Sequence, residues 1–163
     1  MYYYPILLTL HIIFAGIWLV NFLSDFVFRK NIASAKGSIA EKELISLYMK
    51  FVNLLGIIGS MGILITGIIL VLMNPGYSFF QFSANHWLTS KQVLMVVILI
   101  LIFTRVIPVA KKLRAALHLD IKEAGPLEEQ TYINLNKLYS VNFITNLLVL
   151  INFLFAVTHY LYS

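Results

Sequence analysis

The sequence predicts an all-α integral membrane protein, a bundle of four antiparallel helices, from two observations. The first is composition, because 60% of the 163 residues are hydrophobic and only 12% are charged, outside the usual range of water-soluble domains. The second is that four stretches stay apolar over about 20 residues, the length a helix needs to cross a hydrocarbon core of about 30 Å. We therefore expect a single domain, residues 1–163, that is embedded in a lipid bilayer.

The four transmembrane helices are expected over residues 5–28, 51–73, 87–110 and 138–162. Ten of the twelve Lys and Arg residues fall in the connections 29–50 and 111–137. Short connections rich in Lys and Arg stay on the cytoplasmic side, so both termini are predicted on the outer, periplasmic side of a bacterial inner (cytoplasmic) membrane. This multi-pass topology also accounts for the net charge of +5 without a nucleic-acid partner.

Several kinds of chemistry are excluded by what the sequence lacks. It contains no cysteine, which excludes disulfides, thiolate-bound iron–sulfur clusters and covalent haem attachment through C-x-x-C-H. It also contains no phosphate-binding glycine motif, no nucleophile elbow and no H-E-x-x-H. Any chemistry must therefore use His, Lys, Arg or Asp side chains or a bound cofactor.

Polar or small residues recur every seven positions in each expected helix. Seven residues turn a helix through about 700°, close to two full turns, so residues seven apart share nearly one face. The four stripes are His11, Trp18 and Asp25; Asn53, Ser60, Gly67 and Asn74; Lys91, Ile98 and Arg105; and Thr145, Asn152 and His159. This period is typical of helices packed in a left-handed bundle, so we expect the stripes to face inward.

The stripes also align by depth, because neighbouring helices run in opposite directions. Asp25 and Arg105 are expected to meet near the inner face, beside Asn53 and either Asn142 or Thr145. Each charge alone would cost a few kcal/mol in lipid, so the simplest interpretation is a structural ion pair between Asp25 and Arg105. A proton relay is the alternative.

Two histidines and a lysine converge at the outer end. Imidazole is a common axial ligand of haem iron, and a non-covalent b-type haem fits between the facing helices of such a bundle. His11 and His159 are therefore the candidate metal ligands, and Trp18, Gly67 and Lys91 complete the expected cofactor-binding set. The structural alternatives are a hydrogen bond across helices for His11 and an interfacial position near the chain end for His159.

The glycines of the second helix allow two interpretations as well. In "GIIGSMGILITG", Gly56, Gly59, Gly62 and Gly67 could leave room for a macrocycle. They could equally let two helices pack closely, as small residues do in membranes.

Short motifs in three helices resemble one protein family. "LHIIFAGIW", with His11 seven residues before Trp18, is similar to the first helix of HemJ-type protoporphyrinogen oxidases and their relatives in the CopD copper-resistance superfamily. "HWLTSK" resembles the family's W-L-x-x-K, which maps onto Trp87 and Lys91, and "LYSVNF" is loosely similar to the final helix, with Asn142 matching an asparagine.

The resemblance implies a distant relative that binds haem b, with His11 as a ligand and Lys91 as an essential, catalytic neighbour. The sequence also departs from the family. An arginine and a further histidine usually follow the tryptophan there, whereas this chain has Asp25 and a later Arg29 without a histidine. Phe143 stands where the family has an acidic residue.

Three functions are compatible with the sequence. The first is a haem b protein in electron transfer or in porphyrinogen- or quinone-linked oxidation, an oxidoreductase if it is an enzyme, with a redox partner or quinone. The second is copper handling, with His11, His86 and either Met73 or Met95 as ligands. The third is a cofactor-free accessory subunit of a larger membrane complex or a homo-oligomer, in which the polar stripes only hold helices together.

Overall fold

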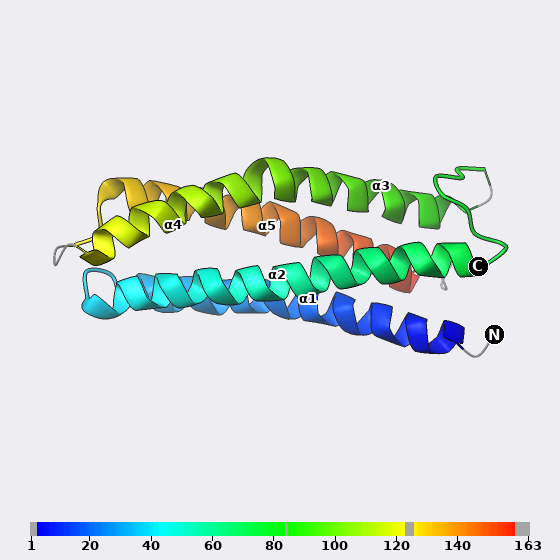
Figure 1. Cartoon of the computed structure of the whole chain (residues 1–163), viewed down its shortest axis with the longest axis horizontal. Helices are drawn as coiled ribbons and strands as arrows, with labels where there is room; N and C mark the ends of the chain where they lie inside the picture. The colour runs from blue at the N-terminus through cyan, green and yellow to red at the C-terminus, as the bar shows by residue number, and fades with distance from the viewer. Residues whose placement is uncertain (1–2, 84, 123–125, 159–163) are drawn as a thin grey trace.

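The chain forms an all-α bundle of four long helices, as the sequence predicts. The computed structural model describes residues 3–83, 85–122 and 126–158. The elements are α1 (Tyr3–Ser34), α2 (Ile39–Met73), α3 (His86–Leu101), the π-helix η1 (Ile102–Val106), α4 (Ile107–Lys122) and α5 (Glu129–Thr158). Because α3, η1 and α4 follow one another without a break, they form one bent helix (Figure 1).

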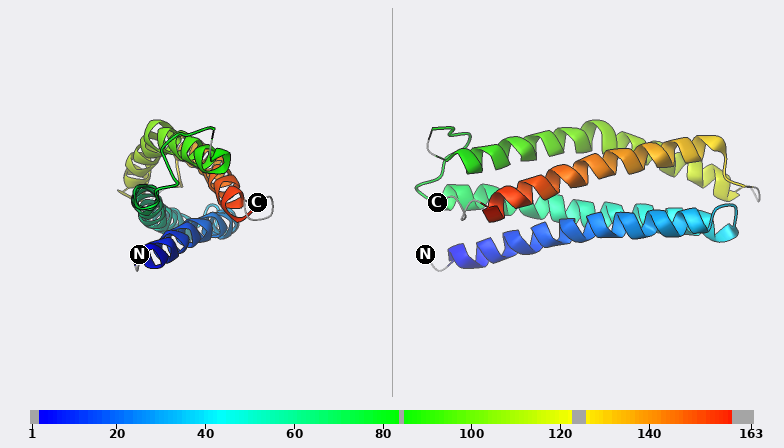
Figure 2. Two further views of the ribbon diagram at one scale, coloured as in Figure 1. Left: turned by 90° about the vertical axis from the view of Figure 1, so that its right-hand side faces the viewer. Right: turned by 180° about the vertical axis from the view of Figure 1, so that it is seen from behind.

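The helices are antiparallel and surround one axis in the order α1, α2, α3 and α5 (Figure 2). The start of α1, the loop 74–83 that follows α2 and the described end of α5 lie at one end of the bundle, which we call the loop end. The turn 35–38, the end of α4 and the start of α5 lie at the opposite end, which we call the basic end after the Lys and Arg residues around it.

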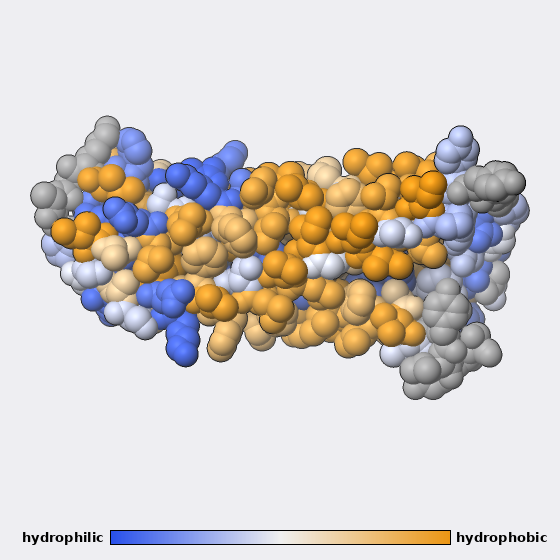
Figure 3. Space-filling view, turned by 90° about the horizontal axis from the view of Figure 1, so that it is seen from below, coloured by the Kyte–Doolittle hydropathy of each residue, from blue (hydrophilic) through white to orange (hydrophobic). Residues whose placement is uncertain are grey.

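The surface of the bundle is apolar along most of its length. All four helices are long and apolar enough to cross a membrane. Yet in the most apolar 18-residue segment of each helix, only 6% to 33% is buried inside the protein. Figure 3 shows this surface as a broad hydrophobic belt with hydrophilic residues gathered at both ends. Apolar side chains that face outward need a lipid environment, so the chain is a multi-pass membrane protein.

The helices continue well beyond the predicted spans. α2 contains 35 residues and is therefore roughly 52 Å long, compared with a hydrocarbon core of about 30 Å. Most of residues 29–50 and 111–137 is helical, since apolar side chains recur on one face between the charged ones. Buried side chains at this end of the bundle form one cluster, which we call the basic-end core. Its members are Ile32, Ile45, Tyr48, Met49, Leu113, Leu117, Leu127, Leu135 and Leu138.

A tight turn joins α1 to α2 within the basic end. Gly37 has a φ of 79°, in the left-handed region that favours glycine, and its N–H donates to Glu41 Oε2 at 2.7 Å. The same carboxylate oxygen accepts a hydrogen bond from Tyr132 Oη at 3.0 Å. Glu41 is buried, and its carboxylate thus ties the turn to α5.

α1 and α2 pack closely along the glycines of α2. A Cβ built on Gly62 would lie 2.1 Å from Phe14 Cγ, and one built on Gly59 would lie 3.1 Å from Trp18 Cβ. Both distances are shorter than an ordinary contact, so Gly59 and Gly62 accommodate the aromatic side chains of α1. This favours close helix packing over room for a macrocycle at these two positions.

In the third long helix, the positions that face the bundle interior change at η1. Pro108 has no N–H to donate to the carbonyl four residues earlier, and its ring crowds that carbonyl. A single wider turn just before the proline relieves both problems and inserts one extra residue into the helix. The inward stripe consequently shifts from positions 91 and 98 to positions 106, 113 and 120, and both Leu113 and Asp120 are buried.

Candidate functional site

The His11 ring is fixed by α2 in the loop-end half of the bundle. Its Nδ1 lies 2.8 Å from Thr66 Oγ1, and Thr66 Oγ1 donates its own proton to the Gly62 carbonyl oxygen at 2.5 Å. The hydroxyl therefore accepts from His11, so that Nδ1 carries the proton and Nε2 keeps a free lone pair. A Cβ on Gly67 would lie 3.3 Å from His11 Cε1, so this glycine makes room for the imidazole itself.

Lys91 reaches the same half of the bundle from α3. It is half-buried, its Nζ lies 5.6 Å from the centroid of the Trp87 ring, and its charge is close enough to interact with the His11 ring. Asn152 on α5 donates from Nδ2 to the Lys91 carbonyl oxygen at 3.2 Å. The structure thus brings together α1, α2, α3 and α5 around His11 and Lys91.

Two further polar atoms in this half are buried without a hydrogen-bond partner among the described residues. They are Thr89 Oγ1 on α3 and Asn152 Oδ1 on α5. The predicted second ligand, His159, lies outside the described residues. The other two residues of the same predicted stripe face inward on α5, because Thr145 is buried and Asn152 contacts α3.

Trp18 lies one heptad further along α1, in the middle of the bundle. It is buried together with Ile98 and Val149, and its Nε1 donates to Asn146 Oδ1 at 3.3 Å. Met95 packs against the same cluster, so it is held away from His86, which is exposed at the start of α3. Among residues 3–83, 85–122 and 126–158, no three His, Cys, Asp or Glu side chains are placed to hold a metal ion.

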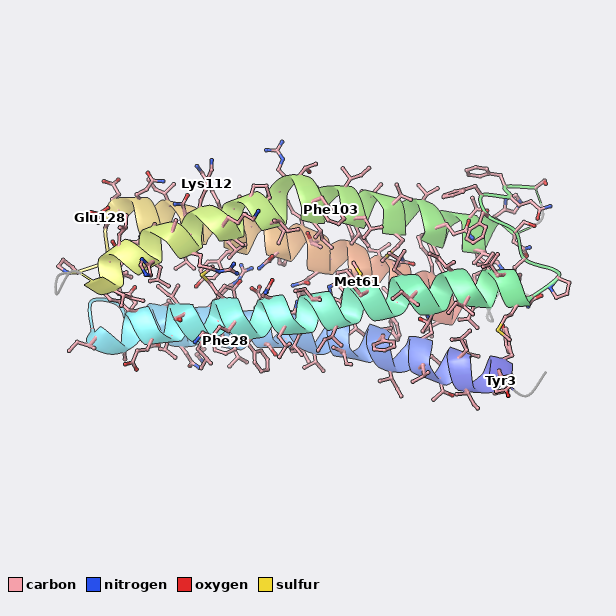
Figure 4. The ribbon with its side chains drawn as sticks, viewed as in Figure 1. Tyr3, Phe28, Met61, Phe103, Lys112 and Glu128 are labelled. Atoms are coloured by element: carbon pink, nitrogen blue, oxygen red, sulfur yellow. The ribbon has the colours of Figure 1, made fainter. Side chains whose placement is uncertain are left out.

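The predicted ion pair between Asp25 and Arg105 is wrong. Asp25 Oδ2 instead lies 2.5 Å from Arg29 Nη2, one turn along the same helix. Arg105 is exposed, because the extra residue in η1 rotates it out of the stripe that holds Lys91 and Ile98. Figure 4 shows Lys112 of α4, further along this bent helix, on its outer side.

Asp25 is the centre of a polar network that crosses three helices. Its Oδ1 accepts from Tyr48 Oη at 2.5 Å, and Asn142 Nδ2 donates to the same tyrosine oxygen at 3.1 Å. Arg29 also donates from Nη2 to the Tyr139 carbonyl oxygen at 2.5 Å, with its guanidinium carbon 4.5 Å from the centre of the Tyr139 ring. The buried carboxylate is therefore paired and hydrogen-bonded at both oxygens.

Sequence reasoning missed Arg29, Tyr48 and Tyr139 as members of this network. The spacing of four between Asp25 and Arg29 is the helical signal that would have indicated their pairing. Tyr48 and Tyr139 lie at the edges of the predicted spans, where the length of the continuous helices was underestimated.

The fold and these contacts define a four-helix multi-pass membrane protein whose polar residues bond to one another across the bundle interior. No family model matches the chain, and no curated protein or solved structure is detectably similar to it.

Proposed function

We propose that the protein binds a b-type haem non-covalently in the loop-end half, with His11 as an axial ligand. The observation that carries the proposal is the hydrogen bond between His11 Nδ1 and Thr66, which leaves the lone pair on Nε2 free. Metal-binding histidines are usually oriented in this way by a hydrogen bond at the other ring nitrogen. The short motifs shared with HemJ-type proteins support the same proposal.

The residues around His11 have the chemistry to hold such a group. Lys91 supplies a cation that would pair with a haem propionate, and the unpartnered atoms Thr89 Oγ1 and Asn152 Oδ1 supply further polar contacts. His159 is proposed as the second axial ligand. When bound, haem supplies one-electron redox chemistry, which fits electron transfer or porphyrinogen- or quinone-linked oxidation.

The orientation in the membrane belongs to the same proposal. The basic end would face the cytoplasm and both termini would lie on the periplasmic side of a bacterial inner membrane. A reporter fused after Ser163 should then read as periplasmic, and one inserted at Gly37 as cytoplasmic. The opposite pattern would overturn the assignment of the loop end to the outer side.

Haem content tests the ligand assignment directly. Wild type, His11→Ala and the control His118→Ala are purified, and haem per polypeptide is measured in the folded fraction. His118 is exposed on α4, so we expect its substitution to leave haem content unchanged. His11→Ala should lose most of the haem. Wild type without haem, or folded His11→Ala with full haem and an unchanged spectrum, would refute the proposal.

A second function, that of an accessory subunit in a larger membrane complex, is favoured by Arg105. This side chain is exposed within the apolar sequence of the third long helix, where a lone charge is costly. A partner helix with a carboxylate would pair with it. If so, purified wild type is colourless and Arg105→Gln reduces the size of the complex extracted from native membranes. An unchanged size would argue against this function.

A further inference from the structure

A cavity of about 170 Å³ lies between the four long helices, in the part of the bundle between Trp18 and the basic-end core. It is separate from the His11 and Lys91 region, since neither residue lines it. Its lining residues come from all four long helices, among them Asn21, Gly56, Ser60, Ile102, Arg114 and Asn146. Such a volume would hold roughly five waters or one small head group.

The floor of the cavity is polar and buried. It is formed by α1 and α5, and its asparagines Asn21, Asn142 and Asn146 are each at most 5% exposed. Asn21 Oδ1 has no hydrogen-bond partner among the described residues, and neither does Asn146 Nδ2. One is an acceptor and the other a donor, and leaving both unpaired in a membrane interior is costly.

The exposed lining residues show where the cavity opens. Asn53 and Ile57 on α2 and Arg114 on α4 are exposed, whereas the floor residues on α1 and α5 are buried. The mouth therefore lies between α2 and α4, which are neighbours in the ring of helices (Figure 2). Apolar side chains such as Val52 and Ile107 line the approach, and Arg114 is the charged member of the lining among the described residues.

We infer that this cavity binds an uncharged amphipathic molecule that enters sideways from the bilayer. Its head group would donate to Asn21 Oδ1 and accept from Asn146 Nδ2, as a hydroxyl or a hydroxyl–carbonyl pair does. Its apolar tail would leave between α2 and α4. A charged head is disfavoured because the floor offers no counter-ion, the nearby Asp25 being paired with Arg29.

The π-helix supports this site from the opposite wall. Ile102 and Val106, the first and last residues of η1, both line the cavity. π-helical turns inside α-helices occur often at functional sites, because they change the course of the backbone and the side chains that face inward. The inference does not depend on haem, since neither His11 nor Lys91 lines this cavity.

The absence of native cysteine allows a direct test. Ser60→Cys places one thiol on the cavity wall, and the control Ser24→Cys places one on α1 outside the lining. Each variant is reconstituted in vesicles and alkylated with N-ethylmaleimide, with and without 1-decanol, decanoate or decane. At about four times its dissociation constant, decanol should slow alkylation of Ser60→Cys roughly fivefold, since only free protein reacts. Alkylation of Ser24→Cys should not change.

A second variant separates occupation of the cavity from effects on the bilayer. A Cβ on Gly56 meets only Asn21 Nδ2, at 3.9 Å, so Gly56→Val can extend into the cavity without a clash at its Cβ. Added to Ser60→Cys, it should abolish protection by decanol, whereas Gly16→Val should preserve it because Gly16 has nothing within 4 Å.

The inference would be overturned by equal slowing of both thiols by decanol, by equal protection by decane or decanoate, by protection that survives Gly56→Val, or by alkylation of Ser60→Cys that no probe slows. The last of these would indicate a cavity that holds only water. A Ser60→Cys thiol that reacts only after denaturation would show that the cavity is closed, and would overturn it as well.

Discussion

In the basic-end half of the bundle, Asp25 has a partner at each carboxylate oxygen and lies next to a core of nine buried apolar residues. In the loop-end half, His11 makes one side-chain hydrogen bond, and Lys91 has no ion pair among the described residues. The charges of the first half are thus neutralised inside the protein. In the second half, the neutral His11 ring and the Lys91 side chain are held in place without an ion pair among the described residues, which is the arrangement expected of groups that meet a ligand.

The largest expected effect is that of removing Asp25. Asp25→Ala leaves Arg29 and Tyr48 without their shared acceptor, and breaking a buried ion pair at one partner costs about 3–5 kcal/mol. We expect a loss of that size in the free energy of unfolding, measured by denaturant titration in mixed micelles. The matched variant Arg105→Gln should change stability little. A similar loss from Arg105→Gln would restore the pairing that the structure contradicts.

Packing between α1 and α2 gives the next largest effect. Gly62→Ala would place a Cβ 2.1 Å from Phe14 Cγ, so the aromatic ring must move, and overpacking of this kind costs about 1–3 kcal/mol. Gly16→Ala is the control, because its Cβ would meet nothing within 4 Å. Thermal unfolding in detergent should separate the two variants. Equal midpoints would mean that α1 and α2 are not in close contact at Phe14.

The number of helices and their inward faces could be predicted from the sequence, and their ends could not. Span length and a period of seven identify the helices and correctly turn Trp18 and Asp25 inward. Charged residues between apolar stretches predict loops, whereas here they lie on the exposed side of continuous helices whose apolar side forms the basic-end core.

The candidate ion pair failed for a local reason. A regular period of seven assumes an unbroken α-helix, and the turn before Pro108 adds one residue, which rotates Arg105 out of the stripe. The proline was present in the sequence as a signal for this change. The true ion-pair partner, Arg29, lies one turn along the same helix, whereas the hydrogen bond from Tyr48 could not be predicted because only the longer α2 brings Tyr48 to Asp25.

A pair of tyrosines sharpens the contrast within the basic-end half itself. Tyr48→Phe removes the hydroxyl that bonds Asp25 and Asn142, and leaving those groups unsatisfied should cost about 1–3 kcal/mol. Tyr139→Phe removes a buried hydroxyl that has no partner among the described residues, so it should be neutral or stabilising. Both variants keep the ring, and the 5.4 Å contact between the two rings is preserved. An equal fall in the free energy of unfolding of the two variants would contradict the hydrogen-bond network around Asp25.

The smallest effect on stability is expected at Thr66, where the comparison between the halves is most sharply tested. Thr66→Val keeps the shape of the side chain and removes the oxygen that accepts from His11 Nδ1. A side-chain hydrogen bond between membrane helices contributes about 0.6 kcal/mol on average, so the unfolding free energy should hardly change. Haem binding should respond much more, because loss of the bond that orients a metal-binding histidine typically lowers affinity roughly 10–100-fold. The control Thr104→Val removes an exposed hydroxyl that donates to the carbonyl oxygen of Ile100 on its own helix, and should change neither quantity. If Thr66→Val instead lowers stability by several kcal/mol and leaves haem affinity unchanged, the hydrogen bond serves only to join α1 to α2, and the loop-end half is as purely structural as the basic-end half.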